Sequence, residues 1–236
     1  MWGGIRRWIH PFSYIVTSPI KIDIWSDIAC PWCYIGKRHL EGGLAALGDD
    51  APEVEIEYHS FELAPDTPVD FEGSEVDFLA KHKGLPESRV QQMLGHVAGV
   101  AAKAGLAYDY DVLQHTKTLK AHELLHFAKE HGLQLELSER LFRAYFTEGR
   151  HVGRIDELVE LAAEVGLDAD AAREALESER YSAAVQADIA QAGTYGIQGV
   201  PFFVFEGKYG VSGAQPVEVF SQVLTQVAGE HDGAVA

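Results

Sequence analysis

The chain has 236 residues, of which 47% are hydrophobic and 10% aromatic, so it is long enough to bury one sizeable core, or one core and a subdomain. Nineteen basic residues against 36 acidic ones give a formal net charge of −17, which would repel nucleic acid phosphates and anionic lipid surfaces. No apolar run reaches the roughly 18 residues that a membrane-spanning helix needs. We therefore predict a soluble globular protein with neither a nucleic acid nor a membrane partner.

The N-terminal residues have the order of a signal peptide, because Arg6 and Arg7 precede a stretch rich in apolar residues. Polar residues interrupt that stretch, and no A-x-A cleavage site follows it. We therefore predict that residues 1–19 are a flexible extension, or follow from a translation start placed too early, and that the protein is cytoplasmic. Export is the alternative, if the first 18 or so residues act as a signal.

A strand-to-helix turn is predicted near residue 30. Isoleucines alternate with polar or aromatic residues from Ile20 to Trp25, which indicates a strand. Apolar residues then recur at helical spacing up to Ala46, and Pro31 suits a first helical turn because its missing N–H leaves no bond unmade there. The run Cys30-Pro31-Trp32-Cys33 therefore lies where the strand gives way to the helix.

Cys30 and Cys33 are the only cysteines in the chain. Two thiols at this spacing can close a small reversible disulfide, and a helix N-terminus favours the thiolate of the leading cysteine. Half of a zinc site is an alternative, but the chain has no second cysteine pair to complete it. Unreactive core cysteines or a structural disulfide are further alternatives, although so short a loop would restrict the unfolded chain little. Thiol–disulfide chemistry is the leading hypothesis.

The remaining elements place a helical block between two parts of a sheet. A second strand is predicted over residues 54–61, a hairpin over 201–212 with its turn at 206–208, and a last helix over 216–227. Helices are predicted at 74–82, 87–104, 116–131, 138–148, 155–165 and 169–192. We therefore predict an α/β protein in which residues 20–68 and 195–236 form one discontinuous domain, interrupted by a helical insertion domain over residues 69–194.

His122-Glu123-Leu-Leu-His126 matches the H-E-x-x-H pattern of zinc proteases on a predicted helix. The longer metzincin pattern is absent, because Lys129 stands where glycine is required, and a third ligand would have to be an acid such as Glu148. The leucines and phenylalanine around the two histidines indicate a packed helix instead. We predict no metal site.

Four segments together resemble the DsbA family of thioredoxin-fold oxidoreductases, and specifically its FrnE-like branch. They are C-P-W-C-Y-I-G-K from residue 30, F-E-L at residue 61, G-V-P-F-F-V near residue 200 and Y-G-V-S-G-A-Q-P near residue 213. The resemblance covers roughly residues 20–228. It implies a thioredoxin-like fold with a large all-helical insertion and protein-disulfide oxidoreductase or isomerase activity.

The resemblance also implies roles for particular residues. Cys30 would be the attacking thiol and Cys33 the resolving thiol, while Val200 and Pro201 would form a cis-proline loop that faces them and binds substrate together with Pro31 and Trp32. Without the resemblance, Pro201 would be an ordinary strand-opening proline. The implied partners are protein thiols and disulfides or a small thiol, with no cofactor unless glutathione serves as co-substrate.

Two features leave the chemistry open. Strongly oxidising relatives carry a histidine in the spacer, where this chain has Trp32, and Asp27 would raise the pKa of the Cys30 thiol if it were close and ionised. A solvated or helix-capping role for Asp27 is the alternative. The alternative function is a glutathione-dependent isomerase or transferase for a small aromatic substrate. Its cleft would have aromatic walls, for which the candidates are Trp32, Tyr34, Phe61 and Tyr145, unless these side chains are ordinary core.

Overall fold

The computed structural model describes residues 18–234. The predicted N-terminal extension or signal falls almost wholly on residues 1–17, which lie outside the described residues. Among the helices of the described part, none is both long enough and apolar enough to cross a bilayer.

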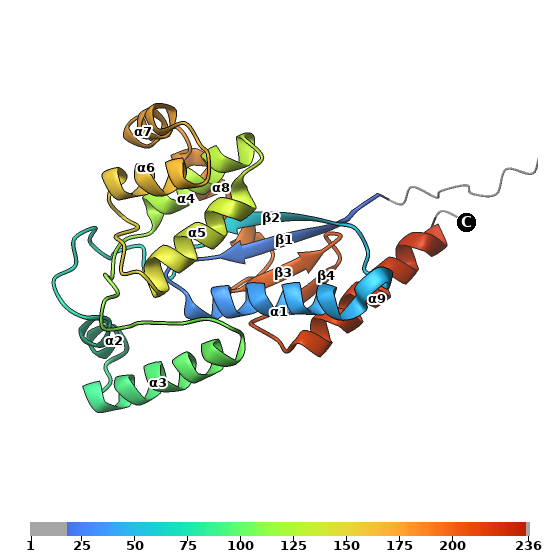
Figure 1. The fold of residues 1–236 in the computed structure, drawn as a ribbon, viewed down its shortest axis with the longest axis horizontal. Coiled ribbons are helices and arrows are strands. Elements are labelled where there is room, and N and C mark those ends of the chain that lie inside the picture. Colours follow the sequence, from blue (N-terminus) through green and yellow to red (C-terminus); the bar gives the residue numbers. More distant parts are fainter. Residues whose placement is uncertain (1–17, 235–236) are drawn as a thin grey trace, which may run out of the picture.

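A four-stranded sheet with the order β2-β1-β3-β4 forms the centre of the molecule (Figure 1). Its strands are β1 (Ile20–Ser26), β2 (Val54–Ser60), β3 (Phe202–Phe205) and β4 (Tyr209–Ser212). Strand β1 pairs in parallel with β2 and antiparallel with β3, so segments about 180 residues apart in sequence are neighbours in the sheet. The predicted hairpin is confirmed, because β3 and β4 pair antiparallel around the turn at residues 206–208.

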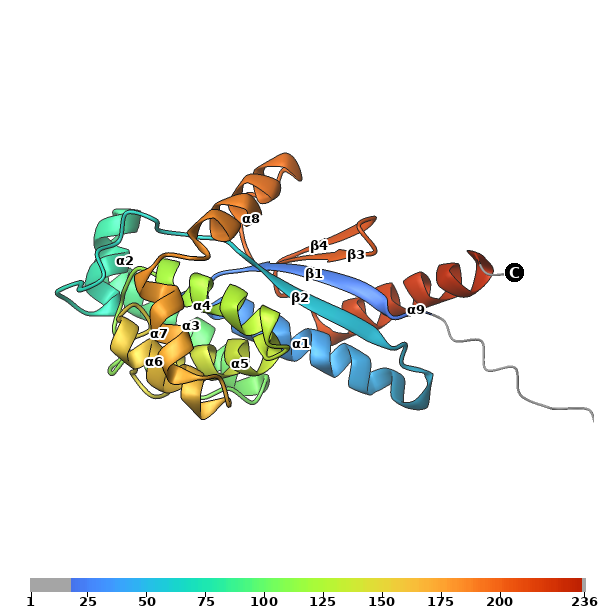
Figure 2. The same cartoon turned by 90° about the horizontal axis from the view of Figure 1, so that it is seen from above.

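Helices cover both faces of this sheet. Helix α1 (Pro31–Leu47), followed by the short 3-10 helix η1 (Gly48–Asp50), lies with α9 (Val217–Ala234) on one face (Figure 2). A Cβ atom on Gly43 would lie 2.7 Å from Cβ of Phe220, so these two helices need glycine at their contact. The opposite face packs Trp25 and Val204 against α8 and the segment that follows it.

A block of helices gathers around the end of the sheet where β1 ends (Figure 1). These helices are α2 (Glu75–Lys83), α3 (Glu87–Lys103), α4 (Leu119–Glu130), α5 (Gln134–Phe146), α6 (Ile155–Glu164), α7 (Ala169–Glu177) and α8 (Ser182–Thr194). Buried side chains of α3, α4, α5, α6 and α7 form one cluster with Cys30, Cys33 and Ile35 at the start of α1. The dithiol therefore lies where the helical block meets the sheet.

Three predicted helices differ clearly from the structure, and one of them is the last, because α9 continues to Ala234 rather than ending at 227. The prediction of one helix over 169–192 is wrong: the chain breaks after α7, where Glu179 has a φ of 53° and the Arg180 N–H donates to the Ala175 carbonyl at 3.1 Å. The break contains neither glycine nor proline, so the sequence pattern held no signal for it. Helix α5 starts at Gln134 rather than at 138, and the Gln134 side chain bonds both the N–H and the carbonyl of Tyr58, at 2.9 Å each, on the edge strand β2.

Candidate active site

The dithiol lies at the N-terminus of α1, as predicted. Cys30 is the N-cap residue, with extended backbone and no side-chain capping bond, and Pro31 occupies the first turn. The Cys33 N–H donates to the Cys30 carbonyl at 3.0 Å, so the two cysteines share one tight turn. Both thiols are free and buried. Cys30 therefore lies at the end of α1 where the helix dipole favours a negative charge.

The loop before β3 faces this turn. The Val200–Pro201 peptide bond is cis, and the Cys30 thiol donates to the Val200 carbonyl with an S···O distance of 3.5 Å. The Gly213 N–H fixes the loop from β4 by donating to the Pro201 carbonyl at 2.8 Å. A Cβ atom on Gly36 would lie 3.0 Å from Cγ of Pro201, so α1 approaches the loop as closely as a glycine allows.

The two thiols differ in their surroundings. Burial raises the pKa of the Cys33 thiol well above its ordinary value, and the adjacent Cys30 raises it further, against smaller opposing effects of Ser26 and the Asp27 backbone. Cys30 lines a cavity, whereas Cys33 is not among the lining residues. An incoming disulfide can thus approach Cys30 from the cavity, while Cys33 keeps its proton at neutral pH.

Asp27 is neither solvated nor a helix cap, because its side chain is buried and Cys30 is the N-cap residue. Its carboxylate accepts hydrogen bonds from the N–H groups of Leu63 at 2.8 Å and Ala29 at 3.2 Å, and lies 3.4 Å from Nε2 of His122. Burial alone would raise the pKa of Asp27, but His122 and the Leu63 amide outweigh burial and lower it. The carboxylate is therefore ionised and engaged on the side of the dithiol turn that faces α4.

The H-E-x-x-H residues do not form a metal centre. His122 faces Asp27, whereas Nε2 of His126 lies 3.0 Å from Oδ2 of Asp188, so the two rings serve different carboxylates. Glu123 lies 3.1 Å from Nζ of Lys120. Glu148, the candidate third ligand, pairs with Arg140 and Arg143. The structure therefore favours the interpretation of α4 as a packed helix.

A different set of described residues, Asp23, Glu57 and His59, brings three potential ligand atoms within 4.8 Å of one another. Burial alone would lower the pKa of His59, but Asp188 and Asp23 raise it to about 9. A protonated imidazole has no lone pair to offer a metal. Lys129 also pairs with Glu57. We therefore interpret this set as an ion-pair network.

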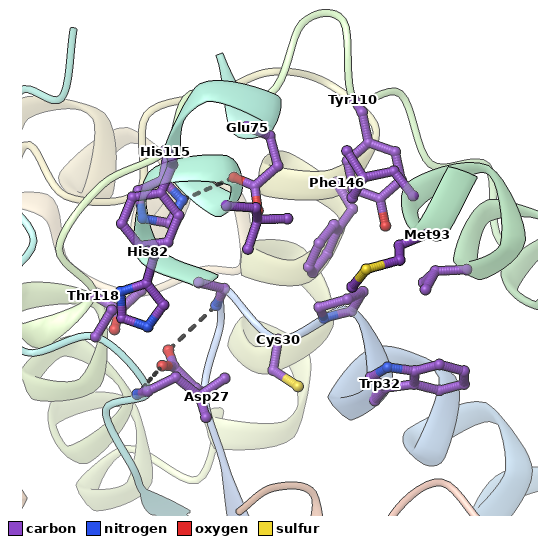
Figure 3. Close-up of a pocket in the computed structure, with 18 of the residues that line it drawn as sticks. Asp27, Cys30, Trp32, Glu75, His82, Met93, Tyr110, His115, Thr118 and Phe146 are labelled. Atoms are coloured by element: carbon purple, nitrogen blue, oxygen red, sulfur yellow. Dashed lines mark hydrogen bonds and ion pairs between the residues drawn. The ribbon is translucent and has the colours of Figure 1, made fainter. Parts of the chain in front are cut away.

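A cavity of about 290 Å³ opens beside Cys30 (Figure 3). Helices α2 and α3, the segment from 110 to 118 and the start of α1 supply its walls. Of the predicted site residues, Cys30, Pro31 and Trp32 line it, whereas Val200 and Pro201 are not among its lining residues, although the Val200 carbonyl contacts the Cys30 thiol. The sequence analysis missed Tyr110 and His115, which also line the cavity, because no motif marks the irregular segment that carries them.

The four aromatic residues proposed as cleft walls do not act together. Only Trp32 lines the cavity beside Cys30. Tyr34 and Tyr145 are buried in the helical core, and Phe61 packs beside Trp25 on the other face of the sheet. The alternative that such side chains are ordinary core is correct for these three.

A family model described as a DSBA-like thioredoxin domain matches residues 21–225. The chain belongs to this family. The predicted DsbA membership and the thioredoxin-like fold with a helical insertion are thereby confirmed, while its FrnE-like branch remains a prediction. This DsbA-like chain is 32% identical over 208 residues to the uncharacterized protein YwbO of Bacillus subtilis (strain 168), covering 87% of this chain and 96% of YwbO.

Two solved structures extend the comparison of this DsbA-like chain. A probable DsbA oxidoreductase from Streptomyces coelicolor is similar with a TM-score of 0.83 and 42% identity, covering 89% of this chain and 91% of that one. The cytosolic disulfide reductase DsbM from Pseudomonas aeruginosa, in a structure with GSH, has a TM-score of 0.62 and 20% identity, covering 88% and 99%. The second likeness is one of fold.

Proposed function

We propose that this DsbA-like protein catalyses thiol–disulfide exchange through Cys30 and Cys33. The Cys30 thiolate attacks a substrate disulfide, a mixed disulfide forms, and the leaving thiolate takes a proton from solvent. Cys33 then gives up its proton and attacks the Cys30 sulfur, which releases the second substrate thiol and leaves a Cys30–Cys33 disulfide. The reverse sequence transfers the disulfide from the protein to a substrate dithiol.

One observation carries this proposal: Cys30 lies at the N-terminus of α1, between the cavity and the Val200 carbonyl, with Cys33 one turn further on. A helix N-terminus stabilises a thiolate through its dipole and free amides. The resolving thiol is held protonated by burial until the mixed disulfide needs it. These are the two unequal thiols that a mixed-disulfide mechanism requires.

In the same proposal, the loop at Val200 and Pro201 docks the substrate backbone beside Cys30. The Val200 carbonyl lies within hydrogen-bonding distance of the Cys30 thiol, so a substrate sulfur bound to Cys30 would lie next to this loop. Pro31 and Trp32 would contact the substrate from the other side, and Trp32 is 37% exposed. The cytoplasmic location predicted from the sequence stays part of this proposal.

Insulin reduction and refolding of reduced ribonuclease test the proposed activity. We expect Cys30→Ser to abolish both activities, while Cys33→Ser accumulates a mixed disulfide between Cys30 and the substrate. A Cys30→Ser variant that retains both activities would refute the assignment of Cys30. Mass spectrometry of the trapped Cys33→Ser species shows which sulfur carries the substrate.

A glutathione-dependent isomerase or transferase remains the second candidate, because the cavity beside Cys30 can enclose a small molecule. Glutathione as a co-substrate is also proposed for this chain, since the DsbM structure of the same fold is one with GSH. The two functions differ in their need for the second thiol. Disulfide exchange requires Cys33, whereas addition of glutathione to a small aromatic substrate would survive Cys33→Ser.

A further inference from the structure

A buried serine hydroxyl without a partner lies at the end of β1. Ser26 is 4% exposed, and its Oγ makes no hydrogen bond within the described part of the chain. Buried polar atoms in proteins are almost always paired, because an unpaired one costs free energy. The Ser26 hydroxyl is therefore a candidate for a role in the chemistry rather than in the stability of the fold.

Ser26 points toward α1. Side chains alternate between the two faces of a strand, so Ser26 lies on the same face of β1 as Ile22 and Ile24. These two isoleucines pack with Leu40 of α1 in one core cluster. Ser26 therefore faces the helix whose first turn carries the dithiol.

Cys33 lies on the side of α1 that faces the sheet. It is 2% exposed and precedes Leu40 by about two helical turns, so the two side chains share one face of the helix. On the same face, a Cβ atom on Gly36 would lie 3.2 Å from the ring of Phe203 in β3. The side chains of Ser26 and Cys33 thus both lie in the layer between the sheet and α1.

Two hydrogen-bond donors are directed at the sulfur of Cys33. The Ser26 hydroxyl and the Asp27 backbone N–H both favour the Cys33 thiolate and lower the pKa of Cys33, against the larger effect of burial. A thiol sulfur is a weak acceptor, whereas a thiolate is charged and accepts strongly. The Ser26 hydroxyl therefore stays unpaired while Cys33 keeps its proton, and it gains a partner when Cys33 ionises.

We propose that Ser26 is a catalytic residue that stabilises the thiolate of the resolving cysteine, with the Asp27 N–H as the second donor. The proposal rests on the proposed exchange activity and names a group for its second step. In that step a proton leaves Cys33 for solvent, and the Cys33 thiolate attacks the sulfur of Cys30. The bond between Cys30 and the substrate sulfur breaks as the Cys30–Cys33 disulfide forms, and the departing substrate thiolate keeps the electron pair.

The expected size of the effect follows from two opposing terms. A hydrogen bond to a charged group contributes about 1.5–3 kcal/mol, so it raises the thiolate fraction of Cys33 by about one to two orders of magnitude. The same bond lowers the nucleophilicity of that thiolate, and this cancels roughly half of the gain on a logarithmic scale. Loss of the Ser26 hydroxyl should therefore slow the attack by Cys33 about 4- to 15-fold.

Stopped-flow reaction of the reduced protein with dithiobis(nitrobenzoate), a coloured aromatic disulfide, separates the two steps. Attack by Cys30 releases the first thionitrobenzoate, and attack by Cys33 releases the second in a step that does not depend on reagent concentration. We expect Ser26→Ala to leave the first release unchanged and to slow the second about 4- to 15-fold. The second release in this variant should also need a higher pH to reach the same rate.

Ser138→Ala is the matched control. The hydroxyl of Ser138 on α5 is likewise buried and unpaired among the described residues, but it faces Tyr58 rather than the dithiol. Both releases should keep their wild-type rates in this variant. A thermal melt of each variant checks that it is folded. Since neither hydroxyl has a partner to lose, both variants should melt close to the wild type.

An unchanged second release in Ser26→Ala, or an equal slowing of both releases, overturns the role of Ser26. The proposed exchange activity then stands on the two releases of the wild type. A wild type that releases only one thionitrobenzoate, or none, contradicts the proposed exchange mechanism itself and the role of Ser26 with it.

Discussion

Two polar clusters lie at the junction of the sheet and the helical block, and they differ in whether each polar atom has a hydrogen-bond partner. In the network around His59, both ring nitrogens have carboxylate partners, Asp23 at 2.8 Å and Asp188 at 3.1 Å. In the cavity beside Cys30, the Tyr110 hydroxyl and one nitrogen of His115 have no partner among the described residues. All the polar groups of the first cluster thus have partners within the chain, whereas the second leaves two polar atoms unpaired among the described residues.

The complete cluster joins the two parts of the molecule. Asp188 on α8 accepts hydrogen bonds from the Ser60 N–H of β2 at 2.8 Å, and it also pairs with His126 on α4 at 3.0 Å. Its backbone carbonyl accepts the indole N–H of Trp25 from β1 at 3.0 Å. Asp188 of α8 therefore ties two strands to α4 and α8, through its carboxylate on β2 and α4 and through its backbone carbonyl on β1. A buried polar network with all partners present stabilises the fold, whereas a buried polar group without a partner costs free energy.

Removing the shared carboxylate should have the largest effect. We expect Asp188→Asn to lower the free energy of unfolding by about 3 kcal/mol, because it removes one of the two carboxylates that pair with His59 and the carboxylate that pairs with His126. Urea denaturation monitored by circular dichroism measures this. Asp156→Asn, at an exposed pair with Arg173, is the control and should change stability little. Equal effects of the two substitutions would contradict the structural role of the network.

The network also makes stability depend on pH. The pKa of His59 is raised from 6.5 to about 9, so its contribution is fully present below pH 6.5 and is lost as the pH rises through 9. We expect the free energy of unfolding to fall by about 1–3 kcal/mol between pH 6.5 and 10, measured by urea titrations at each pH. His59→Gln should flatten this part of the profile. An equally steep fall in the variant would assign the pH dependence to other groups.

Much of the dithiol region was predictable because its signals are local. Strand alternation, Pro31 and the cysteine spacing predict a strand-to-helix turn, and they do so without any long-range contact. The loop at Val200 and Pro201 was predictable only from the family resemblance, since the sequence alone does not distinguish it from a strand-opening proline.

The two polar clusters could not be predicted, because their members come from distant parts of the chain. Glu75 and His115 are 40 residues apart, and His59 and Asp188 are 129 apart. No periodic pattern records which polar side chains meet across elements. The H-E-x-x-H pattern shows that nearness in sequence can also mislead. His122 and His126 are close in sequence, yet they pair with different carboxylates, those of Asp27 and Asp188.

The two thiols should react at different rates. At pH 7, we expect iodoacetamide to alkylate Cys30 at least about tenfold faster than Cys33, because burial raises the pKa of Cys33 and only thiolates react. Mass mapping after brief labelling of the reduced protein gives both rates. Unfolding in guanidinium serves as the control and should remove the difference. Faster labelling of Cys33 in the folded protein would reverse the assigned roles.

The smallest expected effect on stability comes from comparing two neighbouring tyrosines, one whose hydroxyl has a hydrogen-bond partner and one whose hydroxyl has none. The Tyr108 hydroxyl donates to the Pro31 carbonyl at 2.7 Å, whereas the Tyr110 hydroxyl, two residues away, has no partner among the described residues. We expect Tyr108→Phe to lower the free energy of unfolding by about 1 kcal/mol, since it removes one hydrogen bond and leaves a carbonyl short of a donor. Tyr110→Phe should leave it unchanged or raise it, because a buried hydroxyl without a partner is removed.

Urea unfolding of both variants beside the wild type measures the difference, and the two substitutions remove the same atom from the same residue type. If both substitutions cost the same free energy of unfolding, the Tyr110 hydroxyl has a partner in solution, such as a bound water molecule. This hydroxyl is then paired, as the polar groups of the His59 network are. If only Tyr108→Phe is destabilising, the hydroxyl of Tyr110 is retained at no benefit to the fold.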